Sequence, residues 1–217
     1  MLNHTSGIQD HAFLYHEHKR VAIDGNVYGE YLFESDKLPH SVFMPTNEDV
    51  IKILQEFLQS RFKPGAKWER SNSGYVLLVQ LIENITGMHF RDYSKKNIFL
   101  PLAMKQPGVY DESRPKPENK VSSYVAKNGE FADGDYSPLN LIYRDGGIYF
   151  TMNDLVKWQK AWFSPSLLSE ASLNTIRTPG LLIDGSLPKN VVKGKAYGMG
   201  VLMRLTGYLY TSTVEAG

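Results

Sequence analysis

The 217-residue sequence predicts an α+β fold, with helices through the middle of the chain and β-structure near its end. Two observations lead to this class. Apolar residues recur at helical spacing in several segments between residues 46 and 177, and a strand-like run follows residue 196. The apolar fraction of 42% and the charged fraction of 22% are ordinary for a globular protein, and the length suits one domain.

The first predicted helix begins at Thr46, whose hydroxyl can cap free backbone N–H groups. Two acidic residues follow at the positive end of the helix dipole. The face predicted to be buried comprises Val50, Ile51, Leu54, Phe57 and Leu58. In residues 8–45, before this helix, apolar residues show no sustained periodicity. This segment is expected to be a long loop or a set of short elements.

The most apolar helix is predicted over residues 73–87. Its apolar residues leave only a narrow polar stripe, so we expect the helix to be covered on nearly all sides. Gly87 suits the left-handed position that follows the last turn of a helix. A shorter helix is predicted over residues 90–99, before a proline.

A second capping signal predicts a helix over residues 151–162, and a further helix is predicted over residues 169–177. The first opens with the sequence TMND, and its apolar face comprises Leu155, Trp158 and Trp162.

Strands are predicted only near the end of the chain. Residues 197–203 and 208–214 are expected to pair as a β-hairpin with a turn near Gly207. Residues 105–145 are rich in Pro, Gly, Asp and Ser and are expected to form a loop. Because a lone hairpin is only marginally stable, the sequence predicts an antiparallel sheet that is incomplete.

Composition excludes several classes of function. The net charge is +1 with both signs scattered, so a basic surface for nucleic acid is not expected. The absence of Cys excludes disulfides, thiolate nucleophiles and cysteine-based zinc sites. No apolar run approaches the roughly 20 residues that a membrane-spanning helix needs. Composition indicates neither a compartment nor an oligomeric state.

Four segments resemble, in the same order, motifs of the β-lactamase-related serine hydrolases and penicillin-binding proteins, and are closest in pattern to class C β-lactamases. The segments are Leu2–Gly7 (LNHTSG), Pro64–Tyr75 (PGAKWERSNSGY), Asp145–Tyr149 (DGGIY) with the helix after it, and Tyr197–Gly200 (YGMG). Ordered motifs are far more specific than any single one. The resemblance implies a β-lactamase/transpeptidase-like fold, with a helical subdomain and an antiparallel sheet, over a single domain at residues 1–217.

The chemistry that the resemblance implies is hydrolysis or transfer at an amide or ester carbonyl, in a β-lactam, a D-amino-acid peptide or a small ester. A serine in a Ser-x-x-Lys motif forms the acyl-enzyme after the lysine takes its proton. A Tyr-x-Asn motif supplies a proton relay and a substrate-orienting amide, and a His/Lys-x-Gly strand lines the other side. The expected partner is a small-molecule or peptide substrate, with no cofactor, metal, nucleic acid or membrane span.

This chain departs from the family pattern at each motif. Arg70 stands at the tyrosine position of Tyr-x-Asn, while Ser71 and Asn72 match and are predicted to bind substrate. Glu215 stands at the histidine position of the last motif. Arginine stays protonated and cannot act as a base. No catalytic residue is predicted to be intact, so the chain is expected to be inactive and to lack a Ser-x-x-Lys region before residue 1 and part of the sheet after residue 217.

Two site residues have alternative interpretations. Asn72 is equally suited to cap a helix and to orient a substrate. Arg70 is either a surface residue or a ligand for a substrate carboxylate. A chain that keeps Asn72 without its tyrosine partner also suits a non-catalytic binding module for a peptide or a cell-wall fragment.

Other short motifs favour unremarkable interpretations. Ser60 and Ser113 each precede a lysine at Ser-x-x-Lys spacing, but neither is predicted to begin a helix, and such matches arise by chance. His11, His16 and His18 are closely spaced, as in some metal sites, but are expected to be solvated in a polar loop.

Overall fold

The computed structural model describes most of the chain. The described residues are 1–11, 21–23, 26–28, 46–56, 58–110, 119–121, 124–127, 129–133, 146–188, 195–200 and 202–204. The expectations for His16, His18, Ser113 and Glu215 therefore lie outside the described residues.

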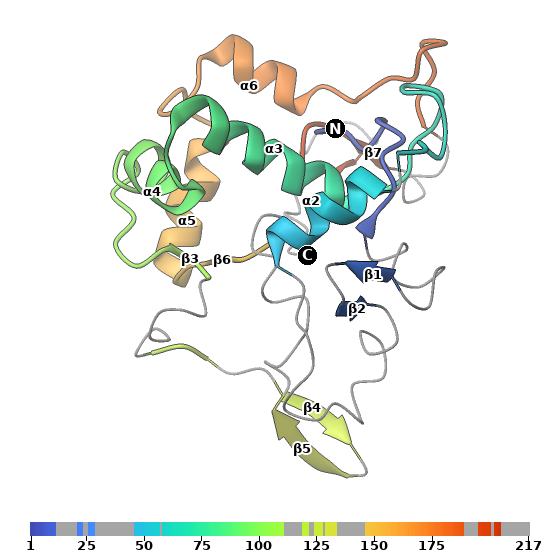
Figure 1. The fold of residues 1–217 in the computed structure, drawn as a ribbon. Coiled ribbons are helices and arrows are strands. Elements are labelled where there is room, and N and C mark those ends of the chain that lie inside the picture. The colour runs from blue at the N-terminus through green and yellow to red at the C-terminus, as the bar shows by residue number, and fades with distance from the viewer. Residues whose placement is uncertain are drawn as a thin grey trace.

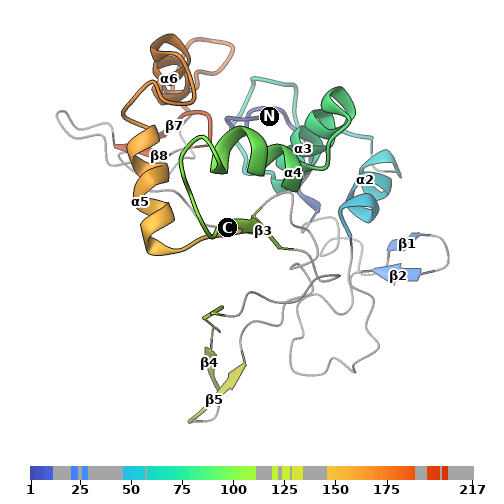
Figure 2. The ribbon, with the colours of Figure 1, turned by 90° about the vertical axis from the view of Figure 1, so that its left-hand side faces the viewer.

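The helices gather on one side of the molecule, in its upper part in Figures 1 and 2. They are α2 (Asn47–Glu56), α3 (Asn72–Thr86), α4 (Phe90–Ser94), the π-helical turn η1 (Lys95–Phe99), α5 (Met152–Ala161) and α6 (Glu170–Arg177). Each corresponds to a predicted helix, which confirms those predictions. In the part of the chain that the structure describes, no helix is both long and apolar enough to cross a membrane.

The strands form four separate antiparallel pairs among the described residues. The pairs are β1 (Val21–Ile23) with β2 (Asn26–Tyr28), β3 (Gly108–Val109) with β6 (Ile148–Tyr149), β4 (Tyr124–Lys127) with β5 (Glu130–Asp133), and β7 (Lys195–Tyr197) with β8 (Leu202–Arg204). The β4–β5 hairpin projects away from the helices in both Figures 1 and 2. Among the described residues these pairs do not join into one sheet.

Two strand predictions were wrong. Residues 105–145 are not only loop, because β3, β4 and β5 lie within them. Near the end, β7 pairs with β8, and the described residues 198–200 between them are not a strand, whereas the prediction placed one continuous strand over residues 197–203. Gly200 adopts a positive φ of 76° there, which a continuous strand does not allow. Residues 208–214 lie outside the described residues.

Helix α2 begins with a reciprocal cap. The Thr46 hydroxyl accepts a hydrogen bond from the Asp49 N–H (3.3 Å), and an Asp49 carboxylate oxygen accepts one from the Thr46 N–H (2.8 Å). Val50 and Ile53 form the buried face. The prediction was wrong for Leu58, which is 84% exposed because the helix ends two residues before it.

Helix α3 is held at both ends. The Ser71 hydroxyl accepts a hydrogen bond from the Gly74 N–H (3.3 Å), and Gly87 closes the last turn with a φ of 64°. Val76 is fully buried and packs against Val50 of α2. The prediction that this helix is covered on nearly all sides was wrong, because Ile85 is 75% exposed.

Helix α5 fixes the loop before β3. The Thr151 hydroxyl caps the helix by accepting from the Asp154 N–H (3.2 Å). The buried Asp154 carboxylate accepts hydrogen bonds from the backbone N–H groups of Lys105 (2.9 Å) and Gln106 (3.1 Å). The predicted apolar face is confirmed for Trp158, whose ring lies 6.0 Å from that of Trp162 in an edge-to-face arrangement.

Candidate functional site

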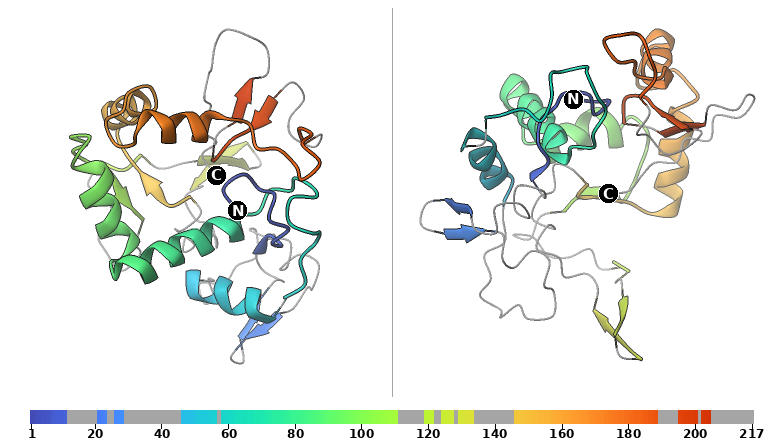
Figure 3. Two further views of the ribbon diagram at one scale, coloured as in Figure 1. Left: turned by 90° about the horizontal axis from the view of Figure 1, so that it is seen from above. Right: turned by 90° about the vertical axis from the view of Figure 1, so that its right-hand side faces the viewer.

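Three of the four motif segments meet at the start of helix α3. The N-terminal segment, defined as residues 1–11, lies beside the first turn of α3 and beside β7 (Figures 1 and 3). The backbone oxygen of Leu2 accepts hydrogen bonds from the Tyr75 hydroxyl (2.9 Å) and from the Gly200 N–H (3.1 Å). Residues far apart in the sequence therefore surround Arg70, Ser71 and Asn72.

Ser71 is buried and serves as the cap of α3. Its own N–H donates to Nδ1 of His4 (3.2 Å), and its hydroxyl accepts from the Gly74 N–H. Among the described residues the hydroxyl has no lysine partner. Ser71 is therefore a structural residue that shapes the site, and its hydroxyl is not activated as a nucleophile.

Asn72 is the first residue of α3 and is half-buried. Its backbone N–H donates to the buried Asp10 carboxylate (2.6 Å). Its side-chain amide has no hydrogen-bonding partner within the described part of the chain. The helix cap is Ser71, so the capping interpretation of Asn72 was wrong. The amide is free to donate to and accept from a ligand.

Arg70 precedes the cap and its side chain is exposed. The guanidinium makes no hydrogen bond or ion pair with any residue that the structure describes. An unpaired guanidinium presents a planar set of donors that matches a carboxylate. The site thus combines one permanent cation with one neutral amide.

Asp10, His11 and Ser73 form a second cluster beneath the first turn of α3. The Ser73 hydroxyl accepts from the His11 N–H (2.7 Å) and lies 3.3 Å from His11 Nδ1. Asp10 approaches the same ring nitrogen at 4.0 Å. A catalytic triad places serine and carboxylate on opposite ring nitrogens, and Ser73 is 0% exposed. The cluster therefore joins the N-terminal segment to α3, and the Ser73 hydroxyl does not have the geometry of a nucleophile.

The expectation that His11 is solvated was wrong, because His11 is only 1% exposed. Its burial lowers the pKa of the ring, and the nearby Asp10 carboxylate partly offsets this effect. No group of three or more potential metal ligands was found among the described residues.

Tyr75 does not replace the missing tyrosine of the Tyr-x-Asn motif. Its burial and the adjacent Tyr197 raise the pKa of its hydroxyl above the usual value. That hydroxyl donates to the Leu2 backbone oxygen and faces the N-terminal segment. A tyrosine that holds its proton this firmly cannot accept one from a reacting group.

Ser60 is exposed and lies beyond the end of α2, with no helix beginning at it. The nucleophilic serine expected from the resemblance lies at a helix start, so Ser60 does not have that geometry.

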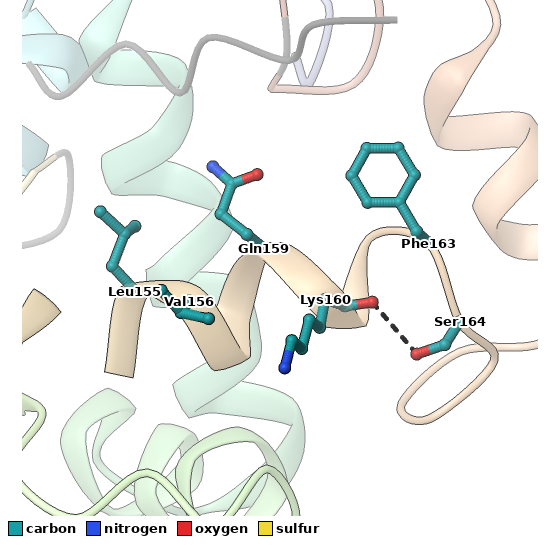
Figure 4. Close-up of a pocket in the computed structure, with 6 residues that line it drawn as sticks. All are labelled: Leu155, Val156, Gln159, Lys160, Phe163 and Ser164. Carbon is teal, nitrogen blue, oxygen red and sulfur yellow. Dashed lines mark hydrogen bonds between the residues drawn. The ribbon is translucent and has the colours of Figure 1, made fainter. Parts of the chain in front are cut away.

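A shallow groove of about 620 Å³ runs along α5, away from Arg70 and Asn72. Figure 4 shows Leu155, Gln159 and Phe163 on one side of the helix, while the Lys160 side chain points to the other. None of the predicted site residues that the structure describes, Arg70, Ser71 and Asn72, lines this groove.

His4, Asp10 and His11 are the site-forming residues that residue-by-residue prediction missed. His4 and its neighbours were visible only as part of the LNHTSG motif, which carried no indication of what its side chains contact. Asp10 and His11 had no signal beyond their type. Their roles depend on contacts with residues more than 60 positions away.

Comparison with known proteins gives a match across the chain. A family model described as Beta-lactamase matches residues 1–214. Penicillin-binding protein 4* of Bacillus subtilis is 29% identical over 199 residues, which cover 85% of this chain and 39% of that protein. A D-aminopeptidase of Brucella ovis is 26% identical over 124 residues, which cover 56% of this chain and 23% of that protein. The chain spans less than half the length of both relatives.

Among solved structures, the octameric penicillin-binding protein homologue from Pyrococcus abyssi has a similar fold, with a TM-score of 0.69 and 25% sequence identity. The similarity covers 94% of this chain and 42% of that one. The predicted fold class is therefore confirmed.

Proposed function

Since this chain belongs to the β-lactamase family, we propose that Arg70, Ser71 and Asn72 form part of a binding site for a substrate with an amide or ester bond. The substrate class is a β-lactam, a D-amino-acid peptide or a small ester, whose carbonyl a serine hydrolase attacks to form an acyl-enzyme. Residues 1–217 act as one domain. This is supported by the hydrogen bond from Gly200 to Leu2, which joins distant parts of the chain.

The free amide of Asn72 is the observation that carries the proposal. Its backbone is fixed by Asp10, while its side-chain amide lacks a partner among the described residues. A half-buried amide without a protein partner forfeits hydrogen bonds that a ligand can supply. The amide both donates and accepts, so it can bind a peptide group or a β-lactam carbonyl.

Arg70 gives the site a preference for substrates with a carboxylate. Its guanidinium is exposed and unpaired in the described structure, so it can form two parallel hydrogen bonds with a carboxylate. The names of the relatives support this substrate class, because penicillins and short D-amino-acid peptides carry a carboxylate.

The 217-residue chain by itself binds substrate without turning it over. Within the described part of the chain, the Ser71 hydroxyl caps α3 and donates to no base, and Ser73 is fully buried against His11. Arg70 cannot take a proton at neutral pH. A hydroxyl without an activating base remains a poor nucleophile.

The test uses the purified chain with a chromogenic β-lactam, a short-chain nitrophenyl ester and the dipeptide D-alanyl-D-alanine. Calorimetry is expected to show saturable binding that Asn72→Ala abolishes, and absorbance is expected to show no hydrolysis. The matched control is Asn84→Ala, an exposed asparagine near the other end of α3. Turnover that a single serine substitution removes would contradict the proposed inactivity. Absence of any saturable binding would contradict the proposed site.

A non-catalytic binding module is the second candidate, favoured by the pairing of Arg70 with the free amide of Asn72. In this case binding of a peptide or cell-wall fragment is itself the function. Binding that is tighter for an uncleavable cell-wall peptide than for the β-lactam and the ester, without turnover of any of them, distinguishes this candidate from the hydrolase.

A further inference from the structure

His4 is enclosed by three aromatic rings from separate parts of the chain. Its ring centroid lies 5.8 Å from that of Trp68, 5.3 Å from that of Tyr75 and 4.9 Å from that of Tyr197. These rings belong to the loop before α3, to α3 itself and to β7. His4 is only 4% exposed, so the enclosure is nearly complete.

The polar groups of His4 bind the chain on both sides of Arg70. Its backbone oxygen accepts a hydrogen bond from the Glu69 N–H (3.0 Å), and its Nδ1 accepts one from the Ser71 N–H (3.2 Å). The backbone of His4 adopts a left-handed φ of 58°, which is costly for a residue other than glycine. Such a conformation persists when surrounding contacts over-determine it.

The hydrogen bond from Ser71 defines the state of the His4 ring. Because Nδ1 accepts, it carries no proton, and the ring is neutral with its proton on Nε2. Burial and the nearby Arg70 lower the pKa of His4 to about 4, so the ring stays neutral at physiological pH.

We propose that His4 is a positioning residue, which fixes the backbone around Arg70 and so aims Arg70 and Asn72 at the substrate. This inference rests on the proposed function. His4 itself is too buried to touch a ligand, so it acts through Glu69 and Ser71. The imidazole of His4 orients the backbone of residues 69–71, while the Arg70 guanidinium and the Asn72 amide contact the substrate.

Two substitutions separate the acceptor from the ring. His4→Asn places an amide oxygen near the position of Nδ1 and tolerates the left-handed backbone, so it keeps the acceptor. His4→Phe keeps an aromatic ring but leaves the Ser71 N–H without a partner. The surface control is His89→Phe, because the side chain of His89 is 79% exposed.

Affinity is measured by calorimetry with D-alanyl-D-alanine and with its C-terminal amide, which lacks the carboxylate. We expect His4→Phe to weaken binding of the dipeptide about five-fold and of the amide less, since both Arg70 and Asn72 shift. His4→Asn is expected to stay within about two-fold of the unmodified protein, and His89→Phe to match it. A lower melting temperature in His4→Phe with unchanged affinity would overturn the inference, as would an equal loss in His4→Asn.

Nitrogen NMR of the unmodified protein gives a test that needs neither folding of a variant nor a ligand. We expect an unprotonated Nδ1 on His4 and slow exchange of the Ser71 amide proton. A proton on Nδ1 at neutral pH would overturn the inference even if His4→Phe fails to fold. If the unmodified protein binds neither probe while these NMR signals are as expected, the proposed function fails and the His4 contact stands.

Discussion

Single buried side chains hold the backbone of this chain at two places. His4 binds the chain on both sides of Arg70, and Asp154 binds the loop that precedes β3. Neither side chain is exposed enough to bind a ligand directly. Substitution of either residue is therefore expected to change the free energy of unfolding and its dependence on pH more directly than it changes activity.

The free energy of unfolding should fall as the pH is lowered from about 6.5 to about 4. The folded-state pKa of His4 is about 4, against 6.5 for an unperturbed histidine, so the unfolded state binds more protons between these values. The burial of His11 acts in the same direction. Urea unfolding at several pH values measures this slope. His4→Asn should reduce it, and an unchanged slope in that variant would contradict the assigned state of His4.

Asp154→Asn should lower the free energy of unfolding by about 2–3 kcal/mol. The amide cannot accept from the Lys105 and Gln106 N–H groups as both carboxylate oxygens do, so a buried donor loses its partner. Urea denaturation measures the change. The matched control is Asp92→Asn, since the side chain of Asp92 is 53% exposed. Similar losses in the two variants would show that the hydrogen bonds from Lys105 and Gln106 to Asp154 add nothing to stability.

The sequence predicted Arg70, Ser71 and Asn72 as site residues, but not which of them caps the helix and which keeps a free side chain. Ser71 and Asn72 were predicted together because the SN pair matched a motif. Both residue types cap helices well, so only the structure assigns the cap to Ser71 and leaves the Asn72 amide free. The burial of His11 was unpredictable locally, because it depends on Ser73.

At the scale of elements, the N-terminal segment follows the loop before α3 through close backbone contacts. The Thr5 oxygen accepts from the Gly65 N–H (2.7 Å), and the Gly7 oxygen accepts from the Arg61 N–H (2.9 Å). A side chain at Gly7 would place its Cβ 2.2 Å from the Phe62 backbone oxygen. Gly7 therefore allows the two segments to approach.

Gly7→Ala should destabilise the protein by about 3 kcal/mol, through a left-handed φ of 76° combined with a backbone clash. Gly185→Ala is the control, because Gly185 has a φ of 78° with no atom near the added Cβ, and should cost about 1 kcal/mol. Thermal unfolding of both variants measures the difference. Equal losses would show that the close approach at Gly7 is not a constraint.

Helices were predicted well and strands poorly, for a physical reason. The start of α5 depends on Thr151 and Asp154, which lie within four residues of each other, so the local sequence is enough to predict it. The β3–β6 pair has two residues on each side, and the paired residues are 41 and 39 positions apart (Gly108 with Tyr149, Val109 with Ile148). Such short strands lack an alternating pattern and depend on contacts that the local sequence does not contain.

For the molecule as a whole, apolar side chains remain on the surface of the central helix. Periodicity revealed that α3 is apolar around most of its circumference, but it does not say what covers each face. Val76 packs against α2, while Leu81 and Ile85 are 47% and 75% exposed. The elements that pack against α3 therefore decide which of its apolar faces is buried.

Val76→Ala should cost about 2 kcal/mol in unfolding free energy, and Ile85→Ala less than about 0.5 kcal/mol, although both residues lie on α3. Chemical denaturation of the two variants is the measurement. A large loss for Ile85→Ala would mean that this face is covered in solution, for example by a second copy of the chain.

The hydrogen bond from the Gly200 N–H to the Leu2 oxygen also has a consequence for how the chain folds. Leu2 is synthesised well before Gly200, so its backbone oxygen has to wait for a partner that is added about two hundred residues later. Contacts of such wide separation lengthen folding times, because the entropy of closing a large loop is lost before the contact forms. We therefore expect the backbone around Arg70 and Asn72, which lies beside this contact, to become ordered late in folding.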